Sequence, residues 1–354
     1  MPGTPFRFPD SGHPPRLLLV AACLVSSACA PPADGPAGDA AAGAQASAED
    51  EWRAYGGDAG GSKYAHLSDI DTANVHRLEV AWTARTGDFP PELYEGVEEH
   101  EGVEIPEDAR AAGACEACHG EAISFETTPL MVDGTLYVST PANRVLALDP
   151  ATGVERWAFA SNVDIERPYS EGLISRGVST WLDEEAPAGA ACRRRIYLGT
   201  IDARLIALDG ASGLPCRDFG DRGTVRLDLG VGLNGREVDA GDYLITSPPA
   251  VVNGVVVVGS AIGDNRRRDV ESGVVRAYDA RTGALRWSFD PVPRAADDPG
   301  AEGWSEEAMR VTGAANVWSI ISADPERDLV FLPTGSAAPD FYGGDRPGRN
   351  DFAN

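Results

Sequence analysis

The chain has 354 residues, of which 43% are hydrophobic, and it contains 40 glycines and 26 prolines. This length allows a sizeable core, and so many turn-forming residues favour an all-β fold over one built from long helices. A formal charge of −25 argues against nucleic acid or an anionic membrane surface as a partner, because binding phosphate groups requires clustered Lys and Arg.

The N-terminal residues have the order of a secretory signal, predicted to cover residues 1–29. Arg16 directly precedes the apolar run 17–25, and small residues lead from this run to Cys29. Cleavage before Cys29 would leave a lipid-anchored protein with residues 30–50 as a flexible linker, whereas cleavage after Ala30 would leave a plainly secreted protein. Both routes predict an oxidising location outside the cytoplasm, the periplasm, with membrane contact only if Cys29 is acylated.

The folded region is expected to begin at residue 51 and to open with a strand at 74–82. An acidic insertion at 88–121 follows and carries Cys115, Cys118 and His119. Their CxxCH spacing matches covalent attachment of a c-type haem, with the histidine as axial ligand. A local disulfide, a loosely bound metal ion or no special role are the alternatives. We expect no haem, because the insertion is rich in carboxylates and poor in the aliphatic residues that enclose a porphyrin.

One pattern then occurs three times. It consists of an apolar strand that ends in Asp, a short turn that ends with Gly, and a second strand that contains an aromatic residue. The copies are 145–149 with Gly153 and Trp157, 205–209 with Gly213 and Phe219, and 274–279 with Gly283 and Trp287. Hairpins that recur every few tens of residues are typical of a β-propeller, in which no single unit buries its own hydrophobic face.

The first unit predicts a complete four-stranded blade. Its strands are expected at 130–132, 135–140, 144–149 and 155–159. Further strands are expected at 194–200 and 204–209, at 255–258, 274–279 and 284–289, and at 318–323 and 329–332. The last unit is unfinished at Asn354, so we interpret the chain as part of a larger ring or as one completed by a partner.

Cys192 and Cys216 flank the hairpin of the second unit. One hairpin unit could bring two such residues together, and a secreted chain permits a disulfide between them.

Together with these repeats, several segments resemble the quinoprotein dehydrogenases that depend on pyrroloquinoline quinone (PQQ). The segments are 52–55, 74–88, Thr246-Ser247-Pro248-Pro249, Gly259-Ser260 with Asp264-Asn265, and 272–276. The resemblance is greatest to the glucose, quinate and shikimate group and covers residues 51–354 apart from the acidic insertion. It implies an eight-bladed propeller, about half of it present here, whose funnel holds PQQ against a calcium ion.

The resemblance also implies site residues. Calcium would be bound by Asp264 and Asn265, and Ser336 stands where relatives that oxidise methanol offer an Asn to the ion. Trp318 would lie under the quinone rings, Glu126 and Arg176 would meet the cofactor's carboxylates and quinone oxygens, and Thr246 and Ser247 would add hydroxyl contacts. Each assignment has an alternative. Asp264 and Asn265 could form a loop turn, and Trp318 could be a packing residue. Glu126 and Arg176 could each belong to an ordinary surface ion pair, and Thr246 and Ser247 could simply start a strand.

The implied activity is oxidation of an alcohol, polyol or sugar, with electrons passed to a membrane quinone or a cytochrome. The glucose enzymes carry a His where this chain has Ala142, which leaves a sugar substrate in doubt. The family's catalytic Asp is expected beyond Asn354, so these 354 residues alone are expected to be inactive. A propeller lipoprotein without catalytic activity, acting as a scaffold of outer-membrane assembly, is the rival hypothesis.

Overall fold

The structure, a computed structural model, describes residues 51–88, 123–238, 241–263 and 267–353. All of them belong to one compact unit, Gln45–Asn354. The predicted signal, the linker, the CxxCH motif and the pair Asp264-Asn265 lie outside the described residues. None of the helices in these four ranges has the length and hydropathy that a membrane span requires.

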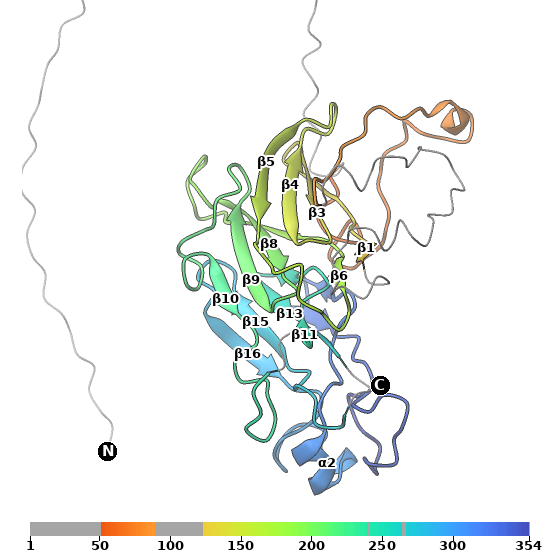
Figure 1. The fold of residues 1–354 in the computed structure, drawn as a ribbon. Helices are drawn as coiled ribbons and strands as arrows, with labels where there is room; N and C mark the ends of the chain where they lie inside the picture. The colour runs from red at the N-terminus through yellow and green to blue at the C-terminus, as the bar shows by residue number, and fades with distance from the viewer. Residues whose placement is uncertain (1–50, 89–122, 239–240, 264–266, 354) are drawn as a thin grey trace, which may run out of the picture. The chain divides into compact units, whose positions relative to one another are not determined.

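Three four-stranded antiparallel sheets follow one another along the chain, and within each the strands pair in sequence order (Figure 1). The first contains β2 (Leu130–Val132), β3 (Thr135–Ser139), β4 (Arg144–Leu148) and β5 (Glu155–Ala160). The second contains β7 (Ser179–Leu182), β8 (Arg194–Gly199), β9 (Arg204–Asp209) and β10 (Thr224–Arg226). The third contains β12 (Ala250–Val252), β13 (Val255–Val258), β15 (Val275–Asp279) and β16 (Leu285–Phe289). These are blades of a propeller.

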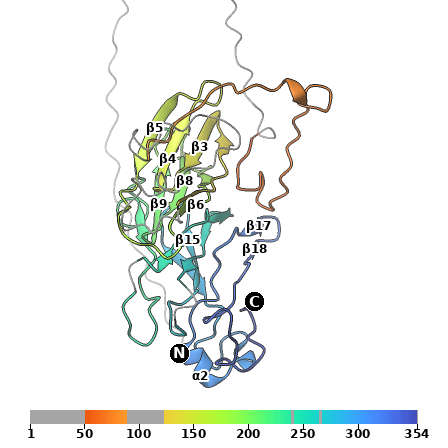
Figure 2. The ribbon, with the colours of Figure 1, turned by 45° about the vertical axis from the view of Figure 1, so that its right-hand side comes forward.

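A two-stranded hairpin, β17 (Ser322–Asp324) with β18 (Leu329–Phe331), continues the series beyond the third blade (Figure 2). The innermost strand β12 lies against both β7 and β17, so the first strands of successive units are neighbours. The remaining elements are β1 (Ile123–Phe125), paired in parallel with β6 (Leu173–Ser175), and β11 (Tyr243–Leu244), paired with β14 (Ala261–Ile262). The helices within the described residues are short: η2 (Val75–Arg77), η4 (Ala301–Gly303) and α2 (Glu306–Val311).

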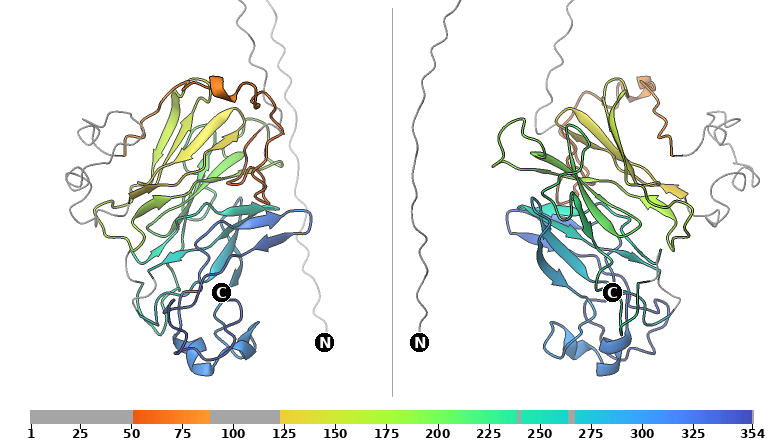
Figure 3. Two further views of the ribbon diagram at one scale, coloured as in Figure 1. Left: turned by 90° about the vertical axis from the view of Figure 1, so that its right-hand side faces the viewer. Right: turned by 60° about the vertical axis from the view of Figure 1, so that its left-hand side comes forward.

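The hydrophobic cores lie between the blades, which face one another in both views of Figure 3. In β8, Ile196 and Leu198 pack with the first blade, whereas Tyr197 packs with the third. Alternate side chains of a strand point to opposite faces of the sheet, and here both faces are covered. This explains why the repeat sequence is apolar at consecutive positions.

The Trp and the Gly of the repeat belong to one contact between blades. The Trp157 indole covers Gly213 of the next blade so closely that a Cβ there would lie 2.5 Å from the ring, and its Nε1 donates to the Gly210 carbonyl at 3.0 Å. Trp82 covers Gly153 in the same way. The second copy of the repeat differs from the prediction, because Phe219 lies in a turn before β10 rather than in a strand.

The strand predicted at 74–82 is wrong. This segment contains η2 and irregular backbone, with Leu78 60% and Val80 84% exposed. A strand needs a neighbour for its backbone hydrogen bonds, and no described strand pairs with this segment. The strand predicted at 318–323 is also shorter than expected, since β17 starts at Ser322.

The three blades and the following hairpin confirm an all-β propeller architecture. The predicted count of eight blades remains a prediction, as does the proportion of the ring that this chain represents.

Candidate functional site

The predicted cofactor residues occupy equivalent places in four successive units. Glu126, Arg176, Thr246-Ser247 and Trp318 each precede the innermost strand of a unit: β2, β7, β12 and β17. The innermost strands of a propeller surround its axis, so residues that precede them gather at one end of the channel.

Arg176 connects these units. Its Nε lies 2.8 Å from Glu126 Oε2, and its Nη1 donates to Thr246 Oγ1 at 2.7 Å. Its guanidinium carbon lies 5.3 Å from the centre of the Trp318 ring. The Arg176 side chain is 17% exposed. A mostly buried guanidinium with several partners is held in one orientation, because its donors form a rigid fork.

Backbone contacts fix the same four segments. The Arg176 N–H donates to the Thr246 carbonyl at 2.9 Å, and the Thr128 N–H donates to the Arg176 carbonyl at 3.2 Å. The Ser247 hydroxyl donates to the Trp318 carbonyl at 2.6 Å. Arg176 therefore contacts three of the other four predicted cofactor residues, Glu126, Thr246 and Trp318. The remaining one, Ser247, holds the backbone of Trp318.

Trp318 presents a flat apolar surface, because it is 49% exposed while the residues before it are buried. Asn316, which the sequence analysis missed, is 5% exposed and donates from Nδ2 to the Ser260 carbonyl at 2.6 Å. Its own carbonyl accepts from the Gly335 N–H at 3.0 Å. A single sequence gives no signal for this role, since the two partners come from distant parts of the chain.

Glu126 is the carboxylate of this cluster, but it is already engaged. Besides Arg176, it accepts a hydrogen bond from the Ser124 hydroxyl at 2.9 Å. Tyr243 in β11 is no better as a base, because burial raises its pKa to about 12. The cluster is suited to binding and orienting a ligand rather than to removing a proton.

The calcium site is only partly within the described residues. Ser336 is half-buried, and its carbonyl accepts from the Ala315 N–H at 3.1 Å, so it lies beside the segment that carries Trp318. Asp264 and Asn265 are outside the described ranges. Whether these three residues converge remains a prediction.

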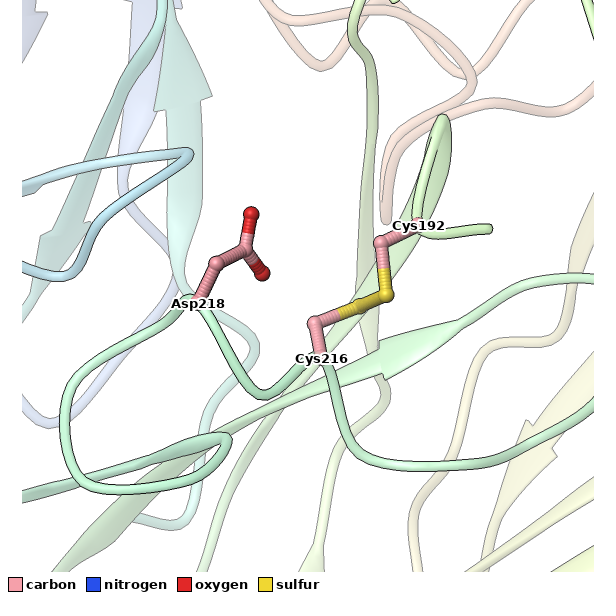
Figure 4. Close-up of side chains that lie close together, drawn as sticks. All are labelled: Cys192, Cys216 and Asp218. Atoms are coloured by element: carbon pink, nitrogen blue, oxygen red, sulfur yellow. A yellow bond between two sulfur atoms is a disulfide. The ribbon is translucent and has the colours of Figure 1, made fainter. Parts of the chain in front are cut away.

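Another group with ligand-like spacing consists of Cys192, Cys216 and Asp218 (Figure 4). The two cysteines form the expected disulfide, with Cα atoms 5.7 Å apart. Asp218 lies 2.5 Å from the buried guanidinium of Arg195. The two cysteines are bonded to each other and Asp218 is paired with Arg195, so this group is structural and not a metal centre.

A cavity of about 1570 Å³ lies against β7, β12, β17 and residues 51–66. None of the predicted cofactor residues lines it. Its Arg281 is committed to Asp183 and Glu185, at 2.6 and 2.7 Å. This cavity therefore does not match the candidate site.

A donor set of one cation, neighbouring hydroxyls and a half-exposed indole fits a planar ligand that carries carboxylates. The fold is thus that of a β-propeller, and this cluster is its candidate ligand site. Residues 52–354 match the family model of the PQQ-dependent glucose/ethanol/alcohol dehydrogenase β-propeller domain. The chain belongs to this family.

Similar proteins include the quinate/shikimate dehydrogenase (quinone) of Acinetobacter baylyi, 34% identical over 83% of this chain and 34% of the relative. The glycerol dehydrogenase large subunit of Gluconobacter oxydans is 36% identical over 83% of this chain and 35% of the relative. The quinoprotein glucose dehydrogenase of Escherichia coli is 34% identical over 84% of this chain and 34% of the relative. The chain spans about a third of the length of these relatives.

Solved structures show the same fold. The quinohemoprotein alcohol dehydrogenase of Comamonas testosteroni superposes with a TM-score of 0.59 at 23% identity, over 85% of this chain and 38% of that one. A europium-containing methanol dehydrogenase gives a TM-score of 0.60 at 22% identity, over 86% and 46%. Identities this low support the propeller fold alone.

Proposed function

We propose that the protein carrying this chain is a periplasmic dehydrogenase that uses PQQ and calcium to oxidise an alcohol, polyol or sugar. The observation that carries this proposal is the convergence of Glu126, Arg176, Thr246 and Trp318 from four successive units. Family membership adds the redox class, since the relatives are quinoprotein dehydrogenases. Electrons would pass to a membrane quinone or a cytochrome.

The residues of this chain bind and orient the cofactor. Trp318 provides the apolar face on which a planar ring system stacks, and Arg176 provides the donors for its carboxylates. Glu126 and the Thr246 hydroxyl hold the guanidinium in place, and the Ser247 hydroxyl holds the backbone of Trp318. When bound, PQQ supplies the hydride-accepting chemistry that no side chain has. Asp264, Asn265 and Ser336 are the calcium ligands we propose, because a hard cation prefers oxygen donors.

The proposed location rests on the N-terminal signal, and a lipid on Cys29 would anchor the protein to a membrane. The segment with Cys115, Cys118 and His119 is proposed to carry no haem. Periplasmic expression with the haem-attachment machinery, followed by a pyridine haemochrome spectrum, tests this point. A stoichiometric haem signal that is lost in Cys118→Ala would contradict it.

The activity is tested on protein expressed in the periplasm from its natural reading frame. The assay follows dye reduction with a panel of alcohols, polyols and sugars, with and without added PQQ and calcium. We expect reduction with at least one substrate that needs both additions and is abolished by Arg176→Met. Absence of activity with the whole panel, or activity that persists in Arg176→Met, would refute the proposed site.

A further inference from the structure

Three hydroxyl groups, two of them buried and that of Thr127 partly buried, form a cluster beside the segments of Glu126 and Arg176. The Thr127 and Ser139 hydroxyl oxygens are 2.6 Å apart, and Ser175 Oγ donates to Ser139 Oγ at 2.8 Å. Thr127 Oγ1 also donates to the Ser175 carbonyl at 3.2 Å. Ser139 and Ser175 are 0% and 2% exposed. Buried hydroxyls without partners would be costly, whereas here each has at least one.

The hydrogens of this cluster can be placed consistently. Thr127 uses its proton for the Ser175 carbonyl, and Ser175 uses its proton for Ser139. The remaining donor for the contact of Ser139 with Thr127 is the Ser139 hydroxyl itself. The bonds therefore form a closed cycle in which Ser139 donates once and accepts once.

This cycle joins the two segments that carry the ion pair. Thr127 follows Glu126 in the chain, and Ser175 precedes Arg176. Ser139, at the end of β3, contacts both neighbours. The separation between the backbone of Glu126 and that of Arg176 is therefore set in part by one buried hydroxyl.

The other blades carry Gly at the position of Ser139. Ser139 pairs with Val145 as Gly199 pairs with Leu205. In the third blade the register ends with Val258 opposite Arg276, and the next residue, Gly259, corresponds to Ser139. A Cβ at Gly199 would lie 2.2 Å from the Ile245 side chain, and one at Gly259 would lie 2.1 Å from the Val317 carbonyl. These two junctions have no room for a side chain.

We propose that Ser139 is a positioning residue. Its hydroxyl holds the segments of Glu126 and Arg176 at the separation at which the guanidinium pairs with the carboxylate and faces the indole. At Gly199 and Gly259 the neighbouring segment packs directly against the glycine, whereas at Ser139 the neighbouring segments are held by hydrogen bonds. The inference that Ser139 supports cofactor binding rests on the proposed function, whereas the inference that it positions Arg176 does not.

The direct test is NMR of the chain without ligand. The Nε–Hε signal of Arg176, assigned by its loss in Arg176→Lys, reports how firmly the guanidinium is held. We expect Ser139→Ala and Thr127→Val to speed its exchange with water about tenfold, the effect of losing roughly one hydrogen bond. Thr127→Ser keeps the hydroxyl and should restore slow exchange, which a role limited to packing would not predict.

Ser161→Ala is the matched control, because Ser161 is 3% exposed and its hydroxyl has no hydrogen-bond partner among the described residues. It should leave the Arg176 signal unchanged. Unchanged exchange in both Ser139→Ala and Thr127→Val would overturn the proposal. Should Ser139→Ala fail to fold, Ser139→Gly removes the same hydroxyl by introducing the residue that the other two blades carry at this position, and it decides in the same way.

PQQ affinity in the presence of calcium gives the second measurement. Ser139→Ala should weaken binding about tenfold, as expected when a charged contact is no longer held in register. Equal affinity in Ser139→Ala and wild type would contradict a positioning role toward the cofactor. If the wild-type protein, expressed from its natural reading frame, binds no PQQ, this would instead overturn the proposed function, and the exchange rates would still decide what Ser139 does for Arg176.

Discussion

Trp318 combines an exposed ring with a backbone that is held on both sides. Ser247 bonds its carbonyl, and Asn316 secures the chain two residues earlier. Ala314 and Ala315 are buried and have φ values of 57° and 58°, a conformation that residues other than Gly adopt only where the surroundings enforce it. The indole is therefore presented on a firmly packed segment, which suits a stacking surface.

Replacing Trp318 should affect binding more than folding. Trp318→Ala is expected to weaken PQQ binding about tenfold or more, because the stacking of an aromatic pair is worth about 1 kcal/mol beyond its buried area. Isothermal titration in the presence of calcium measures this. Trp287→Ala, at a 38% exposed indole on β16, is the control and should bind as wild type. The same loss in both variants would exclude a specific role for Trp318.

Gly213 shows why the repeat needs Gly at its turn. Its φ is +71°, and a Cβ would lie 2.5 Å from Trp157. Gly134 has a similar φ of +68°, but an added Cβ would meet no atom within 4 Å. The pair separates backbone strain from steric conflict.

We expect Gly134→Ala to lower the free energy of unfolding by about 1 kcal/mol, the cost of the left-handed backbone alone. Gly213→Ala should lower it by about 3 kcal/mol, because the indole must also move and its hydrogen bond to the Gly210 carbonyl is put at risk. Urea denaturation provides both values. Equal losses would mean that the contact between Trp157 and the turn contributes little.

At the scale of elements, the second and third blades are joined by an ion pair. Arg281, in the turn after β15, donates from Nε and Nη2 to the two oxygens of Asp183, each at 2.6 Å. Asp183 follows β7 and is 4% exposed. The hydrogen bonds from Arg281 hold the pKa of Asp183 below its ordinary value.

A carboxylate with a lowered pKa stabilises the folded state above its unfolded-state pKa of 3.8, and this stabilisation is lost progressively as the pH falls from there through the lower pKa of the folded state. Wild type should therefore lose more stability between about pH 6 and about pH 3 than Asp183→Asn does, by about 1 kcal/mol. Urea unfolding at the two pH values measures the difference. Asp297→Asn, at an exposed carboxylate, is the control. An unchanged pH dependence in Asp183→Asn would refute the contribution of this pair.

The disulfide Cys192–Cys216 closes a loop with a sequence separation of 24 within the second blade. Cys216 is fully buried in the core shared by the second and third blades. Removing the bond should cost about 3 kcal/mol, mainly because the unfolded chain gains freedom.

The comparison uses the double variant Cys192→Ser/Cys216→Ser and wild type, each unfolded with and without reductant. Reductant should destabilise wild type to the level of the variant and leave the variant unchanged. Destabilisation of the variant by reductant would show that other cysteines, such as Cys115 and Cys118, account for part of the effect.

At the scale of the whole molecule, the strands that the sequence predicted well are those with strong local patterns. β2 and β3 flank the Asp133-Gly134 turn, β4 is an apolar run, and β13 follows the Asn253-Gly254 turn. Turn chemistry and apolar runs act over a few residues, so one sequence contains them. β7 and β10 were missed because they are short and less apolar, and they form strands by pairing with β8 and β9.

The candidate site was predictable by resemblance but not by local pattern. Arg176 and Thr246 are 70 residues apart in the sequence, and Ser247 and Trp318 are 71 apart. Their contact exists only after the blades have assembled. The buried hydroxyl of Ser139 and the amide of Asn316 left no signal for the same reason, because their partners are set by assembly. The opening segment 74–82 shows the opposite failure: its pattern suits a strand, but pairing requires a neighbour.

The most direct test of the account is a crystal structure of this chain grown with PQQ and calcium. We expect the planar cofactor to stack on the Trp318 indole, with one of its carboxylates hydrogen-bonded to Arg176. Cofactor density in the cavity that contains Arg281, or density that touches neither Trp318 nor Arg176, would contradict the central claim that this cluster is a PQQ site.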